Sequence, residues 1–194
     1  YTYENGLKNG PFEEGSVYGY FLMKGVFDAG SPDGEWTYFY YSGDIEKVVN
    51  YKNGKIDGPY KYFYDNGQVN VEGEYLAGEK SGEWTWFTNA GIVDMKGHFV
   101  EGKQHGDWVY NYPTGELSYK AYFEEGKREG TWEYFYKDGS KFKVGVFEND
   151  TKNGLWQTWY ESGVLLMKGH YENDKEEGEW FNYWDNGKLK NKTT

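Results

Sequence analysis

The chain lacks cysteine, has a single arginine (Arg128) and carries few aliphatic side chains. The absence of cysteine excludes disulfides, thiolate metal sites and cysteine nucleophiles, and it leaves the redox compartment open. With 32 acidic against 21 basic residues the formal net charge is −11, so binding to a nucleic-acid backbone is not expected. No apolar run is long enough for a membrane-spanning helix, so we do not expect membrane insertion.

The first residues also lack the basic and then apolar stretch of a secretory leader. We therefore expect a soluble protein and leave its compartment unknown. A location outside the cytoplasm would require that a signal segment was removed.

Aromatic residues supply the apolar material that the aliphatic residues do not. Leu, Ile, Val and Phe together make up less than a fifth of the 194 residues, which at this net charge would be typical of a disordered chain. However, Phe, Trp and Tyr account for 22% of the residues, and disordered chains are poor in aromatics. We therefore predict a folded protein with a core of aromatic rings.

A glycine two residues before a ring recurs every 24 residues without insertion. We number each unit from this glycine as position 1. A second glycine occupies position 10 in all eight units, and an aromatic residue occupies position 18 in the first seven, as does Tyr3 before the first unit. We expect residues 1–194 to form a single repeat domain. Its eight units begin at Gly10, Gly34, Gly58, Gly82, Gly106, Gly130, Gly154 and Gly178.

Each unit shows the pattern of a β-hairpin. Rings at positions 3, 5 and 7 alternate with mostly polar residues, and positions 12, 14 and 18 are largely apolar, which indicates two strands. Positions 9 and 10 carry pairs such as Asn66-Gly67 and Asp138-Gly139, which favour a two-residue type I′ turn. Such a turn predicts that positions 1 and 18, 3 and 16, 5 and 14, and 7 and 12 lie opposite each other.

This register places the indole at position 3 opposite the residue at position 16 of the same unit, where glycine predominates. An indole that lies over a strand glycine covers backbone that would otherwise be bare. Val49 and Ala121 stand at position 16 in two units, so we expect a small side chain to be tolerated there. The predicted indole–glycine pairs are Trp84 with Gly97, Trp132 with Gly145, and Trp156 with Gly169.

A second turn, at positions 20 and 21, joins one unit to the next, as at Asn53-Gly54. In the last two links Asp150 and Asp174 replace the glycine, and we expect the turn to survive because aspartate tolerates left-handed backbone. The ring area of one unit does not offset the cost of ordering it, so the units must stack. The prediction is an all-β fold: an elongated, single-layer antiparallel sheet of tandem hairpins.

The segment Tyr51–Tyr60, with the sequence YKNGKIDGPY, carries a family resemblance. With the Gly-x-Trp-x-x-Tyr-x-x-x-Gly pattern that it joins, it resembles the MORN repeat, in particular the bacterial variant often labelled YwqK-type antitoxin. The resemblance implies a twisted sheet shaped as a rod or half-pipe, and scaffolding or protein binding, with lipid contact proposed for some members. Choline- and glucan-binding cell-wall repeats are also similar, but their unit is shorter and lacks the Asn-Gly-Lys-x-x-Gly link.

We expect no enzyme, no cofactor and no metal site. His98 and His170 share position 17 three units apart, so they should lie far from each other and from His105, whereas catalytic and metal-binding histidines must converge. The adjacent acids Glu124-Glu125 lie at a link turn, where solvated charge is the ordinary interpretation. The same holds for Glu176-Glu177, and the remaining pair is Glu13-Glu14.

The candidate binding residues are the rings at position 6, which should point to the otherwise polar face of the sheet. Exposed rings are used by protein interfaces and by glycan platforms alike. We expect a protein partner, preferably one with a basic surface. The alternatives are carbohydrate binding through the spaced rings, and an antitoxin or immunity role toward a cognate toxin. These residues, here called the polar-face stripe, are Phe39, Phe63, Phe87, Phe135, Trp159 and Tyr183.

Overall fold

The structure is a computed structural model that describes residues 2–194, and these residues form two compact parts. The N-terminal part contains the residues up to Val93 together with Phe99–Lys103. The C-terminal part contains Asp94–His98 and Gln104–Thr194. Strand β9 (Val93–Val100) contributes residues to both parts.

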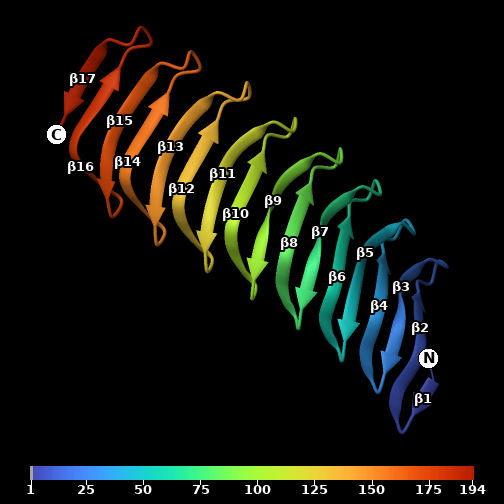
Figure 1. Ribbon diagram of the computed structural model, residues 1–194. Coiled ribbons are helices and arrows are strands. Elements are labelled where there is room, and N and C mark those ends of the chain that lie inside the picture. The colour runs from blue at the N-terminus through green and yellow to red at the C-terminus, as the bar shows by residue number, and fades with distance from the viewer. Residues whose placement is uncertain (1) are drawn as a thin grey trace. The chain divides into compact units, whose positions relative to one another are not determined.

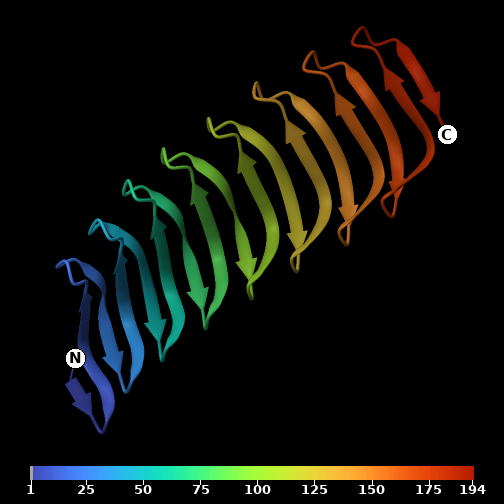
Figure 2. The same ribbon diagram turned by 180° about the vertical axis from the view of Figure 1, so that it is seen from behind.

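All regular structure in residues 2–194 is β-strand. Within each part the strands lie side by side in one layer and follow chain order, as Figure 1 and, from behind, Figure 2 show. Each described pair is antiparallel, as in β6 with β7 and in β12 with β13. The all-β class and the tandem antiparallel hairpins are therefore confirmed. The N-terminal part has β1 (Thr2–Glu4), β2 (Leu7–Gly15), β3 (Phe21–Asp28), β4 (Ser31–Phe39), β5 (Ile45–Lys52), β6 (Lys55–Phe63), β7 (Val69–Leu76) and β8 (Glu79–Phe87). The C-terminal part has β10 (Lys103–Asn111), β11 (Leu117–Glu124), β12 (Lys127–Phe135), β13 (Lys141–Glu148), β14 (Thr151–Trp159), β15 (Leu165–Glu172), β16 (Lys175–Tyr183) and β17 (Leu189–Thr193).

The predicted register holds along most of each hairpin and fails near its tip. In β6 and β7, positions 1 and 18, 3 and 16, and 5 and 14 lie opposite each other, as predicted. The register then shifts, so that Phe63 at position 6 lies opposite Val69 at position 12. The predicted pairing of position 7 with position 12 is therefore wrong, and the same shift occurs between β12 and β13 and between β14 and β15.

The shift results from a turn of a different type. The Gly67 N–H donates to the Tyr64 carbonyl (3.0 Å), and the Tyr64 N–H donates to the Gln68 carbonyl (2.8 Å). Gly67 is left-handed (φ 81°), whereas Asn66 is not among the residues with positive φ. These features define a type I turn followed by a glycine bulge, instead of type I′, which needs positive φ at both central residues.

The type I′ geometry occurs at the links between units. Asn53 and Gly54 both have positive φ (51° and 77°), and the flanking Lys52 and Lys55 are paired. Asp150 keeps this conformation with φ of 71°, which confirms that the turn survives without glycine. The link turns also stack, because the Gly54 N–H donates to the carbonyl of Pro32 in the preceding link (3.0 Å).

The core lies on one face of the sheet, which we call the ring face. The indoles of Trp36, Trp84, Trp132 and Trp156 at position 3 each lie between the rings at position 18 of the preceding unit and of their own unit. For example, Trp132 is near-perpendicular to Phe123 and Phe147, with ring centroids at 5.4 and 5.1 Å. Such edge-to-face pairs add about 0.5–1.5 kcal/mol each to the area that the rings bury. The buried apolar residues occupy only positions 3, 16 and 18: Trp36, Val49, Trp84, Phe99, Trp108, Ala121, Phe123, Trp132, Phe147, Trp156 and Trp180.

The glycine beneath each indole is not the one predicted. Trp132 and Gly145 are opposite in register, as expected, yet the indole that covers Gly145 belongs to Trp156 in the next unit. A Cβ on Gly145 would lie 2.1 Å from the Trp156 ring. The indole leans back across the link and donates from Nε1 to the Val146 carbonyl (3.3 Å). The same displacement places Trp84 over Gly73 and Trp108 over Gly97.

Candidate binding surface

Each ring of the polar-face stripe is the last residue of its strand. Phe39, Phe63 and Phe87 end β4, β6 and β8 in the N-terminal part. In the C-terminal part the corresponding ends are Phe135, Trp159 and Tyr183. All six side chains are half-buried. The structure thus places the candidate residues in one row within each part, and it leaves their function untested.

Neighbouring side chains cover part of the stripe. The Lys120 ammonium lies 5.9 Å from the Phe135 ring centroid, and the Phe21 ring lies 6.5 Å from Phe39. The glycine bulge places position 12 directly across from position 6, so that Ile45 lies opposite Phe39. The rings of the stripe are therefore covered in part by side chains of neighbouring strands.

Tyrosines at position 7 fix the backbone behind the stripe. The Tyr64 hydroxyl donates to the Phe87 carbonyl (2.8 Å), and the Tyr136 hydroxyl donates to the Trp159 carbonyl (2.7 Å). Each such bond joins one hairpin to the next across the tip of the sheet. Position 7 was predicted to continue the ring rows at positions 3 and 5, and the Tyr40 hydroxyl lies 3.4 Å from the Tyr62 hydroxyl at position 5 of the next unit. The position-7 hydroxyl also anchors the stripe of the following unit.

An exposed apolar cluster near the stripe was missed by the sequence analysis. It lies at the tips of the first two hairpins, where Val17 is 95%, Tyr18 82% and Tyr41 78% exposed. The corresponding positions 8 and 9 of the other units carry no aliphatic or aromatic side chain larger than alanine or proline, and that contrast could have revealed the cluster. The cluster meets the stripe through the contact of Phe21 with Phe39. We call it the tip patch, and its members are Val17, Tyr18, Tyr20, Phe21, Tyr41 and Ile45.

On the ring face, lysine ammonium groups lie over several of the rings. The Lys80 ammonium is 4.3 Å from the Trp84 ring, and the Lys143 ammonium is 4.4 Å from Tyr134. Burial lowers the pKa of both lysines. Burial also raises the pKa of the Tyr119 phenol to about 12, with the nearby Tyr110 phenol adding to the shift.

Of the three histidines, one lies beside a member of an acidic pair. His98 and His170 are exposed, and the His105 Nδ1 lies 3.7 Å from the Glu124 carboxylate. Residues 2–194 hold no group of three or more His, Cys, Asp or Glu side chains arranged to bind a metal ion. In the same residues no helix has the length and apolarity that crossing a membrane requires.

The fold and its surface define a class of tandem β-hairpin repeat proteins. The family model described as MORN repeat variant matches residues 32–53, 56–77, 104–127, 152–173 and 176–194. These segments cover more than half of the chain, which therefore belongs to the MORN repeat variant family. The chain is a repeat module of a family that is generally non-catalytic. A search of curated proteins found no match.

Proposed function

We propose that the chain is a non-enzymatic module that docks a protein partner on its polar face, through the polar-face stripe. The observation that carries this proposal is the tip patch in the N-terminal part. There Tyr18 and Tyr41 are largely exposed, and Phe21 connects the patch to Phe39 of the stripe. Contiguous exposed rings are enriched at protein interfaces, because they bury large apolar areas at small entropic cost.

The charge of the chain favours a basic partner. The formal net charge of −11 attracts a cationic surface during diffusional encounter. On the polar face of the N-terminal part, Glu72 is paired with Lys61 (3.0 Å), whereas no ion pair is described for Glu74. The association rate with the partner should therefore fall as ionic strength rises.

Docking of a protein is favoured over sugar stacking because the rings of the polar-face stripe are half-buried, whereas a sugar would need open aromatic planes. On the ring face, Lys80 and Lys143 lie over two of the rings. An antitoxin or immunity role would use the same polar face, with a toxin as the partner.

The test compares the two faces by mutation, after the partner is captured with the wild-type chain and identified. The variant Phe63→Ser/Phe87→Ser should weaken binding by about 1–3 kcal/mol, as loss of central aromatic anchors does. The backbone carbonyls of these residues remain available to the position-7 tyrosines. The control is Trp86→Ser at position 5 on the ring face, with unfolding measured for both variants. Normal binding by the double variant together with lost binding by a folded Trp86→Ser would show that the ring face binds.

A further inference from the structure

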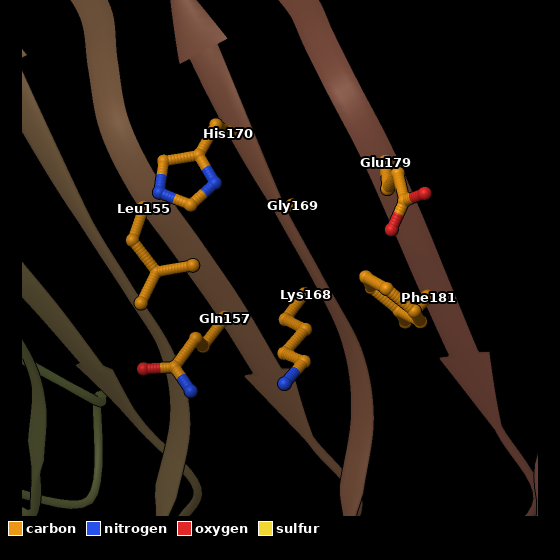
Figure 3. A pocket seen from close by; sticks show the side chains of 7 residues that line it. All are labelled: Leu155, Gln157, Lys168, Gly169, His170, Glu179 and Phe181. Atoms are coloured by element: carbon orange, nitrogen blue, oxygen red, sulfur yellow. The ribbon is translucent and has the colours of Figure 1, made fainter. Parts of the chain in front are cut away.

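A hollow on the polar face of the C-terminal part differs from the rest of the repeat. It has a volume of about 280 Å³. Leu155 and Gln157 of β14, Lys168 and His170 of β15, and Glu179 and Phe181 of β16 line it, as Figure 3 shows. In that view Gln157 and Lys168 extend beside each other toward the same side of the strands.

The walls of this hollow depart from the repeat pattern. Among the eight units, only the last has an aromatic residue, Phe181, at position 4. At position 2, Leu155 is the only apolar residue other than proline. The hollow at the same repeat positions in the N-terminal part has a similar volume of about 270 Å³, but its lining has Thr85 in place of Phe181 and includes Glu72, Glu74 and Glu83 as well as Pro59 and Lys61. The scaffold thus provides a recurrent depression, and in the C-terminal part it has apolar walls.

The charge inside the hollow is positive. The Glu179 carboxylate is neutralised by an ion pair with Lys192. The Lys168 ammonium forms no ion pair with any described residue, and it lies 5.4 Å from the Phe181 ring centroid. An unneutralised ammonium beside a carboxamide donor and an aromatic wall is suited to an anion with an apolar body.

We propose that this hollow binds a small carboxylate that carries an apolar group. The Lys168 ammonium and the Gln157 amide would hold the carboxylate, and Leu155 and Phe181 would contact the apolar group. A dianion such as phosphate fits less well, because Lys168 is the one ammonium in the lining and the apolar walls offer phosphate no polar partner. The volume equals that of about nine waters at about 30 Å³ each, which suits a ligand of about ten non-hydrogen atoms. This site is independent of the polar-face stripe.

The test is a titration of the isotope-labelled full chain with phenylacetate, followed by NMR at the Gln157 side-chain amide. We expect saturable binding with Kd of about 1 mM, the value typical of so small a ligand. Lys168→Met should weaken binding at least about tenfold, which is the scale of one charge-assisted hydrogen bond. The matched control is Lys120→Met, because Lys120 is the position-15 lysine of another unit in the same part. That variant should bind like the wild type.

Further ligands distinguish recognition of the carboxylate from nonspecific apolar binding. They also show whether the carboxylate belongs to a free acid or to a peptide terminus. 2-Phenylethanol, which lacks the charge, and inorganic phosphate should each bind at least about tenfold more weakly than phenylacetate. Equal binding of either one, unchanged affinity in a folded Lys168→Met variant, or no saturation by phenylacetate would overturn the proposal. A peptide ending in a free C-terminal phenylalanine offers the same groups. Tighter binding of the peptide would assign the site to a chain terminus, and tighter binding of phenylacetate would assign it to a free acid.

Discussion

Replacement of Gly145 by valine tests how the ring face is packed. A Cβ at this position would lie 2.1 Å from the Trp156 ring, so any side chain must displace the indole or bend the strand. Trp156 is 5% exposed and lies between Phe147 and Tyr171, at 5.3 and 5.8 Å. The perturbation therefore acts on a closed row of rings.

The expected cost follows from these contacts. Overpacking of a core costs about 1–3 kcal/mol. Complete expulsion of the indole would approach the cost of removing a buried Trp side chain, about 3–5 kcal/mol. We therefore expect Gly145→Val to lower the free energy of unfolding by about 2–4 kcal/mol. Gly145→Ala should cost less, because Ala121 is accommodated beside Trp132, which still donates to the Tyr122 carbonyl (3.3 Å).

A second substitution tests which ring is involved. At the natural exception, Val49 at position 16 lies opposite Tyr60 of the next unit, a smaller ring than the usual indole. Gly145→Val combined with Trp156→Tyr should therefore recover part of the loss, measured by urea unfolding monitored by circular dichroism. The matched control combines Gly145→Val with Trp132→Tyr and should show no recovery. Rescue by the Trp132 change in place of the Trp156 change would refute the assignment of the indole to the following unit.

Three further predictions concern a tyrosine at a hairpin tip, the left-handed glycine at position 1 and a half-buried tyrosine phenol. Tyr136→Phe removes the hydrogen bond to the Trp159 carbonyl and should lower the free energy of unfolding by about 0.5–1.5 kcal/mol, measured by urea titration. Gly130→Ala imposes a side chain at φ of 65° and should cost about 1–2 kcal/mol, whereas an equal melting temperature would refute strain at position 1. Burial raises the pKa of the Tyr119 phenol, so its contribution to folding stability is fully present below the ordinary pKa of 10.0. This contribution should be lost as the pH rises toward about 12, as measured by tyrosinate absorbance together with circular dichroism. Because the chain has 21 tyrosines, the Tyr119 ionisation is taken from the difference between the wild type and Tyr119→Phe, and a difference that appears near pH 10 would contradict this burial effect.

The period and most of the register could be predicted because they depend on residues close in sequence. The spacing of glycines and rings determines which residues share a face, and it located the buried rows at positions 3 and 18. The tip turn could not be inferred from Asn66-Gly67 alone, because that pair suits more than one turn type. The hydrogen bonds of Tyr64 with Gly67 and Gln68 favour the bulged turn here.

The indole partner could not be inferred either, because opposition along a strand pair does not determine the direction in which a side chain leans. Trp156 has Gly169 opposite it in register, yet it lies over Gly145. Strand β14 pairs with β13, which contains Gly145, and the register of this pair shifts beside Gly145. The left-handed Gly154 lies on β14 at this bulge. Pattern analysis of single residues does not detect such a displacement.

The polar-face stripe was assigned to the face opposite the indoles because positions 3 and 6 differ by an odd number of positions, and the contact of Phe135 with Lys120 agrees with that face. How far neighbouring side chains cover it depended on contacts between strands. For example, Lys61 and Lys141 form ion pairs with Glu72 and Glu133 at 3.0 and 2.9 Å. The tip patch and the hollow around Lys168 depend on departures of single units from the repeat, which a consensus of the repeat conceals.

Photo-crosslinking from adjacent residues tests the proposed binding face most directly. A photoreactive phenylalanine analogue at Phe63 lies on the polar face, and the same analogue at Tyr62 lies on the ring face of the same strand. With the captured partner, we predict a crosslinked adduct from position 63 and none from position 62. An adduct from position 62 alone would contradict the proposed binding face.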